Sequence, residues 1–187
     1  PPFLKDAQGN DTKEAGYFLA VNRGKRSITV NLESPDGQRI VRELAMNCDI
    51  VLENYKVGAL ARYGLDEASL RNLNPRLIYA SVTGFGQTGP RRDQSAYDFL
   101  IQAMGGLMSV TGEKDDQPGG GPQKVGIPIV DLMSGMYAAV AVLAAGCDVA
   151  LVCSGDLADT EAAAAVAPPL GGASLDRYRR ACAILQH

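Results

Sequence analysis

Leu77-Ile78-Tyr79-Ala80-Ser81-Val82 decides the fold. This short apolar run is typical of a strand that is buried in a parallel sheet. Asp49-Ile50-Val51-Leu52-Glu53 has the same character. Between the two, Glu67 to Leu73 predicts a short helix, which Asn74-Pro75 ends because proline disfavours a helical residue before it. Two buried strands joined through a helix indicate a parallel sheet.

Upstream of these strands the pattern continues. Ser34-Pro35-Asp36-Gly37 predicts the start of a helix, with Ser34 as the N-cap and Pro35 at the first helical position. Ser27 to Leu32 alternates polar and apolar residues and predicts a further strand, while residues 1–16 are polar and predict a loop. The strand–helix–strand–helix–strand order indicates the α/β class, with an open, mostly parallel, Rossmann-like sheet and flanking helices.

Downstream, the chain turns helical. Tyr97 to Val110 predicts a helix that contains a Gly105-Gly106 pair, and Glu113 to Gln123 predicts a flexible loop. Ile129 to Ala145 predicts a strong helix, small and apolar on most faces, which we expect to be buried. Residues 146–187 differ in character and show no clear strand–helix alternation. We therefore predict one partial large domain over residues 1–145, followed by an atypical tail.

Composition excludes several classes of function. Eighteen basic against 21 acidic residues argue against a nucleic-acid partner, because such binders normally carry a basic excess. The chain has four cysteines and one histidine, His187, too few for a Cys/His metal site or a Ser-His-Asp triad, so we expect no metal. Cysteine usage favours reduced thiols, and neither a signal peptide nor a bilayer-spanning stretch is visible. These features predict a cytoplasmic protein without a membrane partner.

Asp131 is the first candidate for chemistry. It lies among apolar neighbours at the start of the helix predicted over residues 129–145. A carboxylate there is costly to bury unless its charge is met, and we expect the free N–H groups and the dipole of the first helical turn to meet it. One interpretation is an ordinary acidic residue at a helix N-terminus. The other is a nucleophile or base in a partly closed site.

Two cationic turns are candidates for binding anions. Asn22-Arg23-Gly24-Lys25-Arg26 carries three cations in five residues, and Gly24 lets a ligand approach the backbone. A solvated turn is the alternative. Glu53-Asn54-Tyr55-Lys56, with Arg62 further on, offers an amide, an aromatic ring and two cations at a strand end, where ligands of open parallel sheets bind.

Two glycine-rich segments do not predict nucleotide sites. Gly84, Gly86 and Gly89 match the spacing of a dinucleotide fingerprint, but Pro90 follows and no acidic residue stands at the expected place on a following strand. Gly119-Gly120-Gly121 lacks both the preceding strand and the following Gly-Lys-Ser/Thr of a phosphate-binding loop.

Taken together and in order, the segments resemble the class III CoA-transferases, the CaiB/BaiF family. The resemblance extends from about the first residue to Ala145. The motifs that carry it are Asn22-Arg23-Gly24-Lys25-Arg26-Ser27, Val51-Leu52-Glu53-Asn54-Tyr55-Lys56-Val57-Gly58, Asn74-Pro75-Arg76-Leu77-Ile78-Tyr79, Gly84-Phe85-Gly86-Gln87-Thr88-Gly89-Pro90, Tyr97-Asp98, Gly105-Gly106-Leu107-Met108, Thr111-Gly112 and Asp131-Leu132-Met133-Ser134-Gly135-Met136-Tyr137.

The resemblance implies a reaction. The family moves CoA between carboxylic acids, and the aspartate at the position of Asp131 attacks the donor thioester. An acyl–aspartyl anhydride and then an aspartyl–CoA thioester follow, and backbone N–H groups around the site would stabilise the oxyanions. Asp98 matches an acidic position near the reacting centre. CoA and acyl-CoA would be substrates, with no permanently bound cofactor.

The resemblance also assigns binding residues. The positions that hold the adenine and phosphates of CoA in relatives are matched by Asn22, Arg23, Gly24, Lys25, Asn54, Tyr55, Lys56 and Arg62. The Gly84-to-Pro90 and Asp131 motifs look closest to members acting on small dicarboxylates. Relatives form interlocked homodimers, so the full-length parent is expected to do the same.

Two alternatives stay open. The family includes 2-methylacyl-CoA racemases, which use a histidine immediately before the position of Asp98 together with the aspartate at Asp131. Tyr97 occupies that position here, which favours a transferase. The other alternative is a non-catalytic CoA-transferase remnant.

The chain departs from the family pattern at both ends. It starts after the family's first strand–helix–strand unit, and residues 146–187 resemble none of the segments that come after the corresponding helix in relatives. We therefore expect residues 146–187 to arise from a frameshift or a truncated gene model. Residues 1–187 alone should be poorly stable and inactive, because surfaces meant for the missing parts would be exposed.

Overall fold

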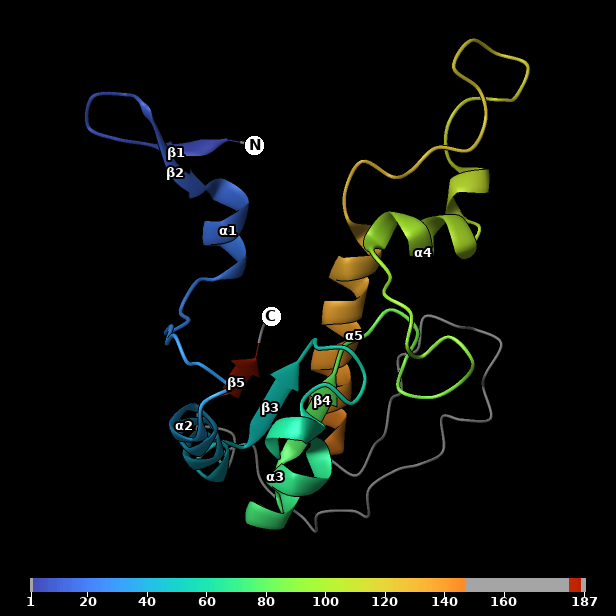
Figure 1. Ribbon diagram of the computed structural model, residues 1–187. Helices are drawn as coiled ribbons and strands as arrows, with labels where there is room; N and C mark the ends of the chain where they lie inside the picture. The colour runs from blue at the N-terminus through green and yellow to red at the C-terminus, as the bar shows by residue number, and fades with distance from the viewer. Residues whose placement is uncertain (1, 147–181, 186–187) are drawn as a thin grey trace. The chain divides into compact units, whose positions relative to one another are not determined.

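The computed structural model describes residues 2–146 and 182–185 (Figure 1). These residues belong to two compact units, Pro1–Asn31 and Leu32–His187, which are described in turn.

The first unit is a hairpin followed by a short helix. Strand β1, Phe3–Lys5, pairs antiparallel with β2, Asp11–Ala15, and α1 covers Gly16–Val21. The prediction of a loop over residues 1–16 was wrong. The turn formers in this stretch close a hairpin, and the flanking residues supply its two strands.

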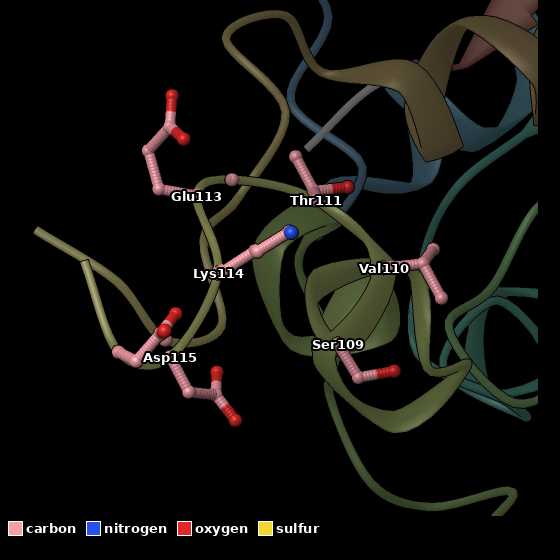
Figure 2. A pocket seen from close by; sticks show the side chains of 9 residues that line it. Ser109, Val110, Thr111, Glu113, Lys114 and Asp115 are labelled. Carbon is pink, nitrogen blue, oxygen red and sulfur yellow. The ribbon is translucent and has the colours of Figure 1, made fainter.

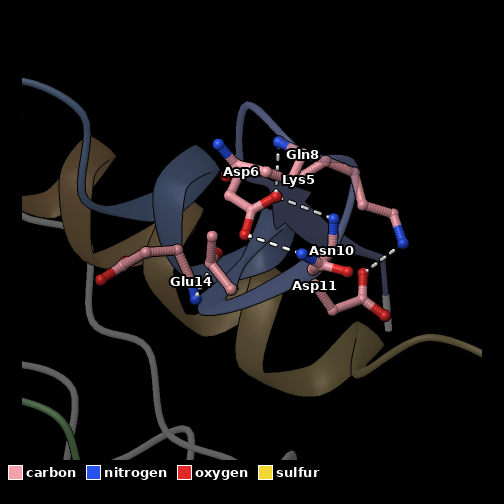
Figure 3. A network of polar contacts seen from close by, with 7 residues as sticks. Lys5, Asp6, Gln8, Asn10, Asp11 and Glu14 are labelled. Carbon is pink, nitrogen blue, oxygen red and sulfur yellow. Dashed lines mark hydrogen bonds and ion pairs between the residues drawn. The ribbon is translucent and has the colours of Figure 1, made fainter.

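The side chain of Asp6 holds this hairpin turn together (Figure 3). Its Oδ1 accepts hydrogen bonds from the backbone N–H groups of Gln8, at 2.9 Å, and Asn10, at 2.8 Å. Gly9 takes a φ of 84°, a left-handed conformation that favours glycine. The backbone N–H of Asn10 is the main cause that lowers the pKa of Asp6, and an ion pair of 2.6 Å joins Lys5 to Asp11.

The predicted strand over Ser27 to Leu32 is also wrong. The segment is irregular, and the side chain of Ile28 is 63% exposed. Alternation of polar and apolar residues stabilises a strand only where a neighbouring strand and a packed face exist. The strands of the described residues pair elsewhere.

The second unit is built on a three-stranded parallel sheet. Its strands are β3, Ile50–Glu53, β4, Ile78–Ser81, and β5, Cys182–Leu185, in the order β4-β3-β5. Both pairings of the central strand β3 are parallel. The predicted parallel sheet and the places of its first two strands are therefore confirmed. The predicted burial holds only in part, because β3 alternates half-buried and buried residues whereas all four residues of β4 are half-buried. β5 was not predicted, and predictions for the remainder of residues 147–187 lie outside the described residues.

Helices flank this sheet as expected. Helix α2, Pro35–Met46, has Ser34 as its N-cap, whose Oγ accepts from the N–H of Gly37 at 3.0 Å. Helix α3, Glu67–Leu73, packs against α2 and is preceded by a 3-10 turn, η1, Ala61–Tyr63. The buried apolar side chains gather in this part of the unit: Val41, Ala45, Cys48, Val51, Leu60, Leu65, Leu70 and Leu77.

The first helix after the sheet is shorter than predicted. Helix α4 covers Asp98–Met104, and a separate 3-10 turn, η2, covers Leu107–Val110. The predicted single helix breaks at Gly105-Gly106 because Gly106 adopts a φ of 80°, which ends a right-handed helix.

Helix α5, Ile129–Ala145, has the predicted bounds but not the predicted burial. It contacts α4 and β4 and contains no buried residue. Met136 is 63% exposed and Leu143 is 59% exposed. An apolar helix needs cover on several sides, and within the described residues these two elements are its main neighbours. No helix of the described residues is long and apolar enough to cross a membrane.

Candidate active site

Asp98 and Asp131 come together where α4 meets the start of α5. Asp98 lies in the first turn of α4, and its Oδ1 accepts from the backbone N–H of Val130 at 2.7 Å and of Asp131 at 3.4 Å. The N-cap of α5 is Pro128, whose side chain cannot cap the helix. Asp98 therefore does from a neighbouring helix what an N-cap side chain normally does locally. The structure brings together the two residues that the sequence assigned to catalysis.

Gln102 completes this junction. It lies four residues after Asp98, on the same face of α4, and is only 1% exposed. Its Nε2 donates to Asp98 Oδ2 at 2.5 Å and to the carbonyl oxygen of Ile127 at 3.4 Å. Its Oε1 accepts from the backbone N–H of Val125 at 2.8 Å. One buried amide thus ties α4 to both the loop before α5 and the carboxylate that caps it.

The first-turn N–H groups of α5 are occupied rather than free. Two donate to Asp98, and those of Ile129 and Leu132 donate to the carbonyl oxygens of Ile127 and Pro128 at 2.8 Å and 3.0 Å. The expectation that free N–H groups there compensate Asp131 is therefore wrong. Asp98, a second carboxylate, accepts from two of the N–H groups that were expected to compensate the charge of Asp131.

This arrangement sets the electrostatics of Asp131. Desolvation by burial is the main cause that raises its pKa above 3.8, and the negative charge of Asp98 raises it further. Within the described part of the chain its carboxylate oxygens accept no hydrogen bond. The side chain is exposed, so a substrate can reach it. A more basic, accessible and unshared carboxylate has the properties of a nucleophile.

Glu53 stabilises the candidate CoA-binding turn after β3 through a hydrogen bond to its backbone. This residue is 6% exposed, and its Oε2 accepts from the backbone N–H of Tyr55 at 2.6 Å. Asn54 and Lys56 on either side are exposed, and Tyr55 is half-buried. Burial raises the pKa of Tyr55, with smaller contributions from Glu53 and Tyr63. The amide and the cation of this turn are free to meet a ligand.

Arg62 lies in η1 and stacks on its neighbour. Its guanidinium carbon lies 4.5 Å from the centre of the Tyr63 ring. η1 begins five residues after Lys56, and we call the polar, aromatic and cationic residues of the two segments the β3-end surface: Asn54, Tyr55, Lys56, Arg62 and Tyr63.

The Asn22-to-Lys25 turn belongs to the first unit. Asn22 ends α1, where its Nδ2 donates to the carbonyl oxygen of Phe18 at 2.9 Å and its Oδ1 accepts from Lys25 Nζ at 3.1 Å. Gly24 has a φ of 74°, and a Cβ there would meet no atom within 4 Å. Arg23 is exposed. The turn is therefore open to an approaching anion on its glycine side.

The loop from Gly84 to Ala96 leads into α4. A Cβ added to Gly84 would lie 2.9 Å from Ala96 N and 3.1 Å from Ala96 Cα, with Ala96 Cβ nearer still. The two ends of this loop thus touch, one residue before Tyr97, the 72% exposed N-cap of α4. Arg91 from the same loop lies 3.7 Å from Met104 Sδ, at the far end of α4.

A separate hollow of about 450 Å³ opens between η2 and the loop after it (Figure 2). It is lined by Ser109 to Asp116 and Gly121, and Glu113, Asp115 and Asp116 give it three carboxylates against the single ammonium of Lys114. This acidic lining opposes the phosphates of CoA. None of the candidate site residues lines it. Among residues 2–146 and 182–185, no group of His, Cys, Asp and Glu side chains could hold a metal ion.

Two residues of the site were missed by the sequence, Gln102 and Tyr63, and Glu53 was quoted with its turn but given no role. Gln102 had a usable signal, since it follows Asp98 by four residues on a helix and so shares its face. Glu53 had one too, as an acidic residue that ends a buried strand. Tyr63 carried none, because its place next to Arg62 in the sequence does not show that the guanidinium lies over its ring.

Comparison with known proteins gives a consistent match. The family model of CoA-transferase family III matches residues 4–175. A succinate–glutarate CoA-transferase of Agrobacterium fabrum is 50% identical over 145 residues, which are 78% of this chain and 35% of that protein. A succinyl-CoA:glutarate CoA-transferase of Mus musculus is 43% identical over 144 residues, which are 77% of this chain and 30% of that protein.

The solved structures agree. A CaiB/BaiF family protein from Brucella suis superposes with a TM-score of 0.67 at 47% identity, over 76% of this chain and 36% of that one. The chain thus spans about a third of the length of the proteins that it matches.

Proposed function

Because this chain belongs to CoA-transferase family III, we propose that the protein that carries it moves CoA from an acyl-CoA to a carboxylic acid, with Asp131 as the nucleophile. One observation carries the assignment of Asp131: its carboxylate is exposed, shares no hydrogen bond within the described residues and has a raised pKa beside Asp98. The chemistry needs a carboxylate that is accessible and more basic than usual.

The proposed reaction proceeds in two pairs of steps. An Asp131 carboxylate oxygen attacks the thioester carbonyl carbon, the C–S bond breaks, and CoA leaves as the thiolate. The thiolate then attacks the Asp131 carbonyl carbon of the mixed anhydride, which forms an aspartyl–CoA thioester and releases the donor acid. The acceptor carboxylate attacks this thioester and again expels the thiolate. The thiolate finally attacks the acceptor acyl carbon, which gives the new acyl-CoA and frees Asp131.

The oxyanions of these steps need donors other than the first turn of α5. The N–H groups of Val130 and Asp131 are engaged by Asp98. Asp98 therefore acts in this proposal by holding the start of α5 rather than by transferring a proton. We therefore expect the oxyanion donors to come from segments other than the start of α5.

CoA binding is assigned to the two cationic turns. Asn22, Arg23, Gly24 and Lys25 form one, and the β3-end surface forms the other. Guanidinium and ammonium groups suit the phosphates of CoA, and the Tyr55 ring suits its adenine. Glu53 supports this assignment because its Oε2 accepts from the backbone N–H of Tyr55 at 2.6 Å, which fixes the backbone of the second turn.

Small dicarboxylates are the proposed acids. The similar proteins are named for succinate and glutarate, and another, from Haloarcula marismortui, is a succinyl-CoA:mesaconate CoA-transferase that is 40% identical over 149 residues. All three names pair succinate or succinyl-CoA with a second dicarboxylic acid. We also propose a cytoplasmic location and an interlocked homodimer for the full-length protein.

Trapping tests the nucleophile. The protein that carries this chain, incubated with succinyl-CoA and hydroxylamine, should acquire a hydroxamate at Asp131, because both proposed intermediates are activated acyl derivatives of that carboxylate. Peptide mass spectrometry locates the modification, and the same incubation without succinyl-CoA is the control. An enzyme that transfers CoA while Asp131 stays unmodified would refute the mechanism.

The pH profile of kcat/KM should show the raised pKa of Asp131. The nucleophile must be ionised, so activity falls as pH drops through its pKa. Because burial and then Asp98 raise that pKa, the acid limb should lie above the ordinary value of 3.8. Initial rates from pH 3 to 8 measure it, with enzyme stability checked at each pH. An acid limb at or below 3.8 contradicts the prediction.

A further inference from the structure

We propose that Gln102 is a positioning residue for the nucleophile, which it holds through Asp98 and Val125. The link from Asp131 to α4 runs through the backbone: the N–H of Asp131 meets Asp98, and Asp98 meets Gln102. The inference rests on the proposed function for the role of Asp131. The geometry of the Asp98–Gln102 pair stands independently of it.

The pair is a directional chain of donors and acceptors. Backbone N–H groups donate at both ends: that of Val125 to Gln102 Oε1, and those of Val130 and Asp131 to Asp98 Oδ1. The side chains of residues 98 and 102 lie between these two sets of backbone donors. Each of them must therefore offer an acceptor to the backbone, and one of them must donate to the other. A carboxamide next to a carboxylate satisfies this requirement, since only the amide carries the central N–H.

Burial gives the pair its importance. Gln102 is 1% exposed, so an atom of this junction that loses its partner has little access to water. Together the pair fixes both ends of residues 125–131, the segment that ends at the nucleophile. Small displacements of a reacting group lower rates by up to about a hundredfold, so a fixed segment is a catalytic requirement.

Two substitutions separate positioning from mere stability. Gln102→Ala removes both the central donor and the acceptor for Val125. Gln102→Glu keeps the acceptor and places a second carboxylate against Asp98 Oδ2, at the present 2.5 Å contact. That contact can persist only with a shared proton, because two adjacent carboxylates do not both ionise. The glutamate variant should therefore be intact at low pH and open at high pH.

The surroundings of residue 102 leave Asp98 and Asp131 as the charges that set this behaviour. Asp98 is on α4 itself, and α5 contributes Asp131 and Tyr137. η2 has no titratable residue, and Lys124 precedes Val125 in the loop. The two carboxylates raise the pKa of a glutamate at position 102, so its loss of the proton falls above the ordinary value of about 4.3.

The experiment measures kinetics and amide hydrogen exchange in the full protein. Gln102→Ala should lower kcat about tenfold to a hundredfold and leave KM for succinyl-CoA within about twofold. Exchange at the N–H groups of Val130 and Asp131 should become at least about tenfold faster. Gln102→Glu should approach wild-type kcat near pH 5 and lose it as pH rises, a limb that the wild type lacks. Gln117→Glu, on an exposed loop, is the matched control and should behave as wild type.

Each result either supports or overturns a stated part of the proposal. Unchanged kcat in Gln102→Ala, or faster exchange without a loss of kcat, overturns the positioning role. A Gln102→Glu profile that follows the wild type overturns the shared-proton chain, and melting curves at pH 5 and pH 8 identify a variant that is merely unfolded. If the wild-type protein transfers no CoA at all, the proposed function fails. The exchange data then still decide whether Gln102 holds the start of α5.

Discussion

Asp131→Asn is expected to abolish CoA transfer without lowering the thermal unfolding temperature at pH 7. An amide cannot form the anhydride, so kcat/KM should fall by about 10³-fold or more. Stability should stay equal or rise, because the ionised carboxylate is unfavourable in the folded protein. Calorimetry or fluorescence melting, run beside the transfer assay, measures both effects. Asp116→Asn, which removes an exposed carboxylate from the lining of the separate hollow next to η2, is the control.

The sign of the stability effect follows from proton linkage. The folded protein holds the Asp131 proton more tightly than the unfolded chain does, since its pKa is raised above 3.8. The carboxyl therefore stabilises the fold fully below pH 3.8, and this contribution is lost as pH rises through the folded pKa. Any advantage of Asp131→Asn should be present at pH 7 and absent below pH 3.8. A variant that melts earlier at pH 7 would contradict this account.

Gly84→Ala should destabilise the protein and lower its activity together. The added methyl group would lie 2.9 Å from Ala96 N, and the backbone there cannot yield without moving the residues after it. Overpacking of this kind costs about 1–3 kcal/mol or more. Ala96 directly precedes Tyr97 and Asp98, so the displacement reaches the carboxylate that caps α5. Denaturant unfolding and kcat measure the two effects.

Gly126→Ala provides the matched control for this substitution. It is also a glycine close to the site, yet a Cβ there meets no atom within 4 Å and its φ is ordinary. Its stability should therefore change by less than about 0.5 kcal/mol, or rise slightly as the unfolded chain loses freedom. If both alanine variants lose the same stability, the contact between Gly84 and Ala96 is not the cause.

The sequence was most informative where local and long-range preferences agree. The bounds of α3 and α5 were predicted, because the Asn74-Pro75 break and the small, apolar run of residues 129–145 are local signals. The strand predicted at residues 27–32 failed because strand formation depends on a partner that the local pattern cannot reveal. The hairpin of residues 3–15 was missed because its residues are polar and were assigned to a loop. The turn is closed by hydrogen bonds to the side chain of Asp6, which composition does not show.

For the site, the sequence identified residues but not their relations. Asp98 and Asp131 were both expected near the reaction, and the structure joins them. Asp98 accepts from N–H groups that were expected to compensate the charge of Asp131. This contact depends on the packing of α4 against α5. Such packing is a tertiary property that no spacing rule contains. The same holds for Gln102, which matters because of the groups that it touches in the neighbouring loop.

The parallel pairing of β3 with β5 has a consequence for how this protein is made. Ile50 lies opposite Cys182, about 130 residues later in the chain. Synthesis at about 5–20 residues per second leaves that side of β3 open for on the order of ten seconds. During this interval an apolar strand offers its unpaired backbone to any other strand nearby. Folding of the sheet is thus expected to be completed late, and we expect the nascent chain to depend on chaperones until residues 182–185 emerge.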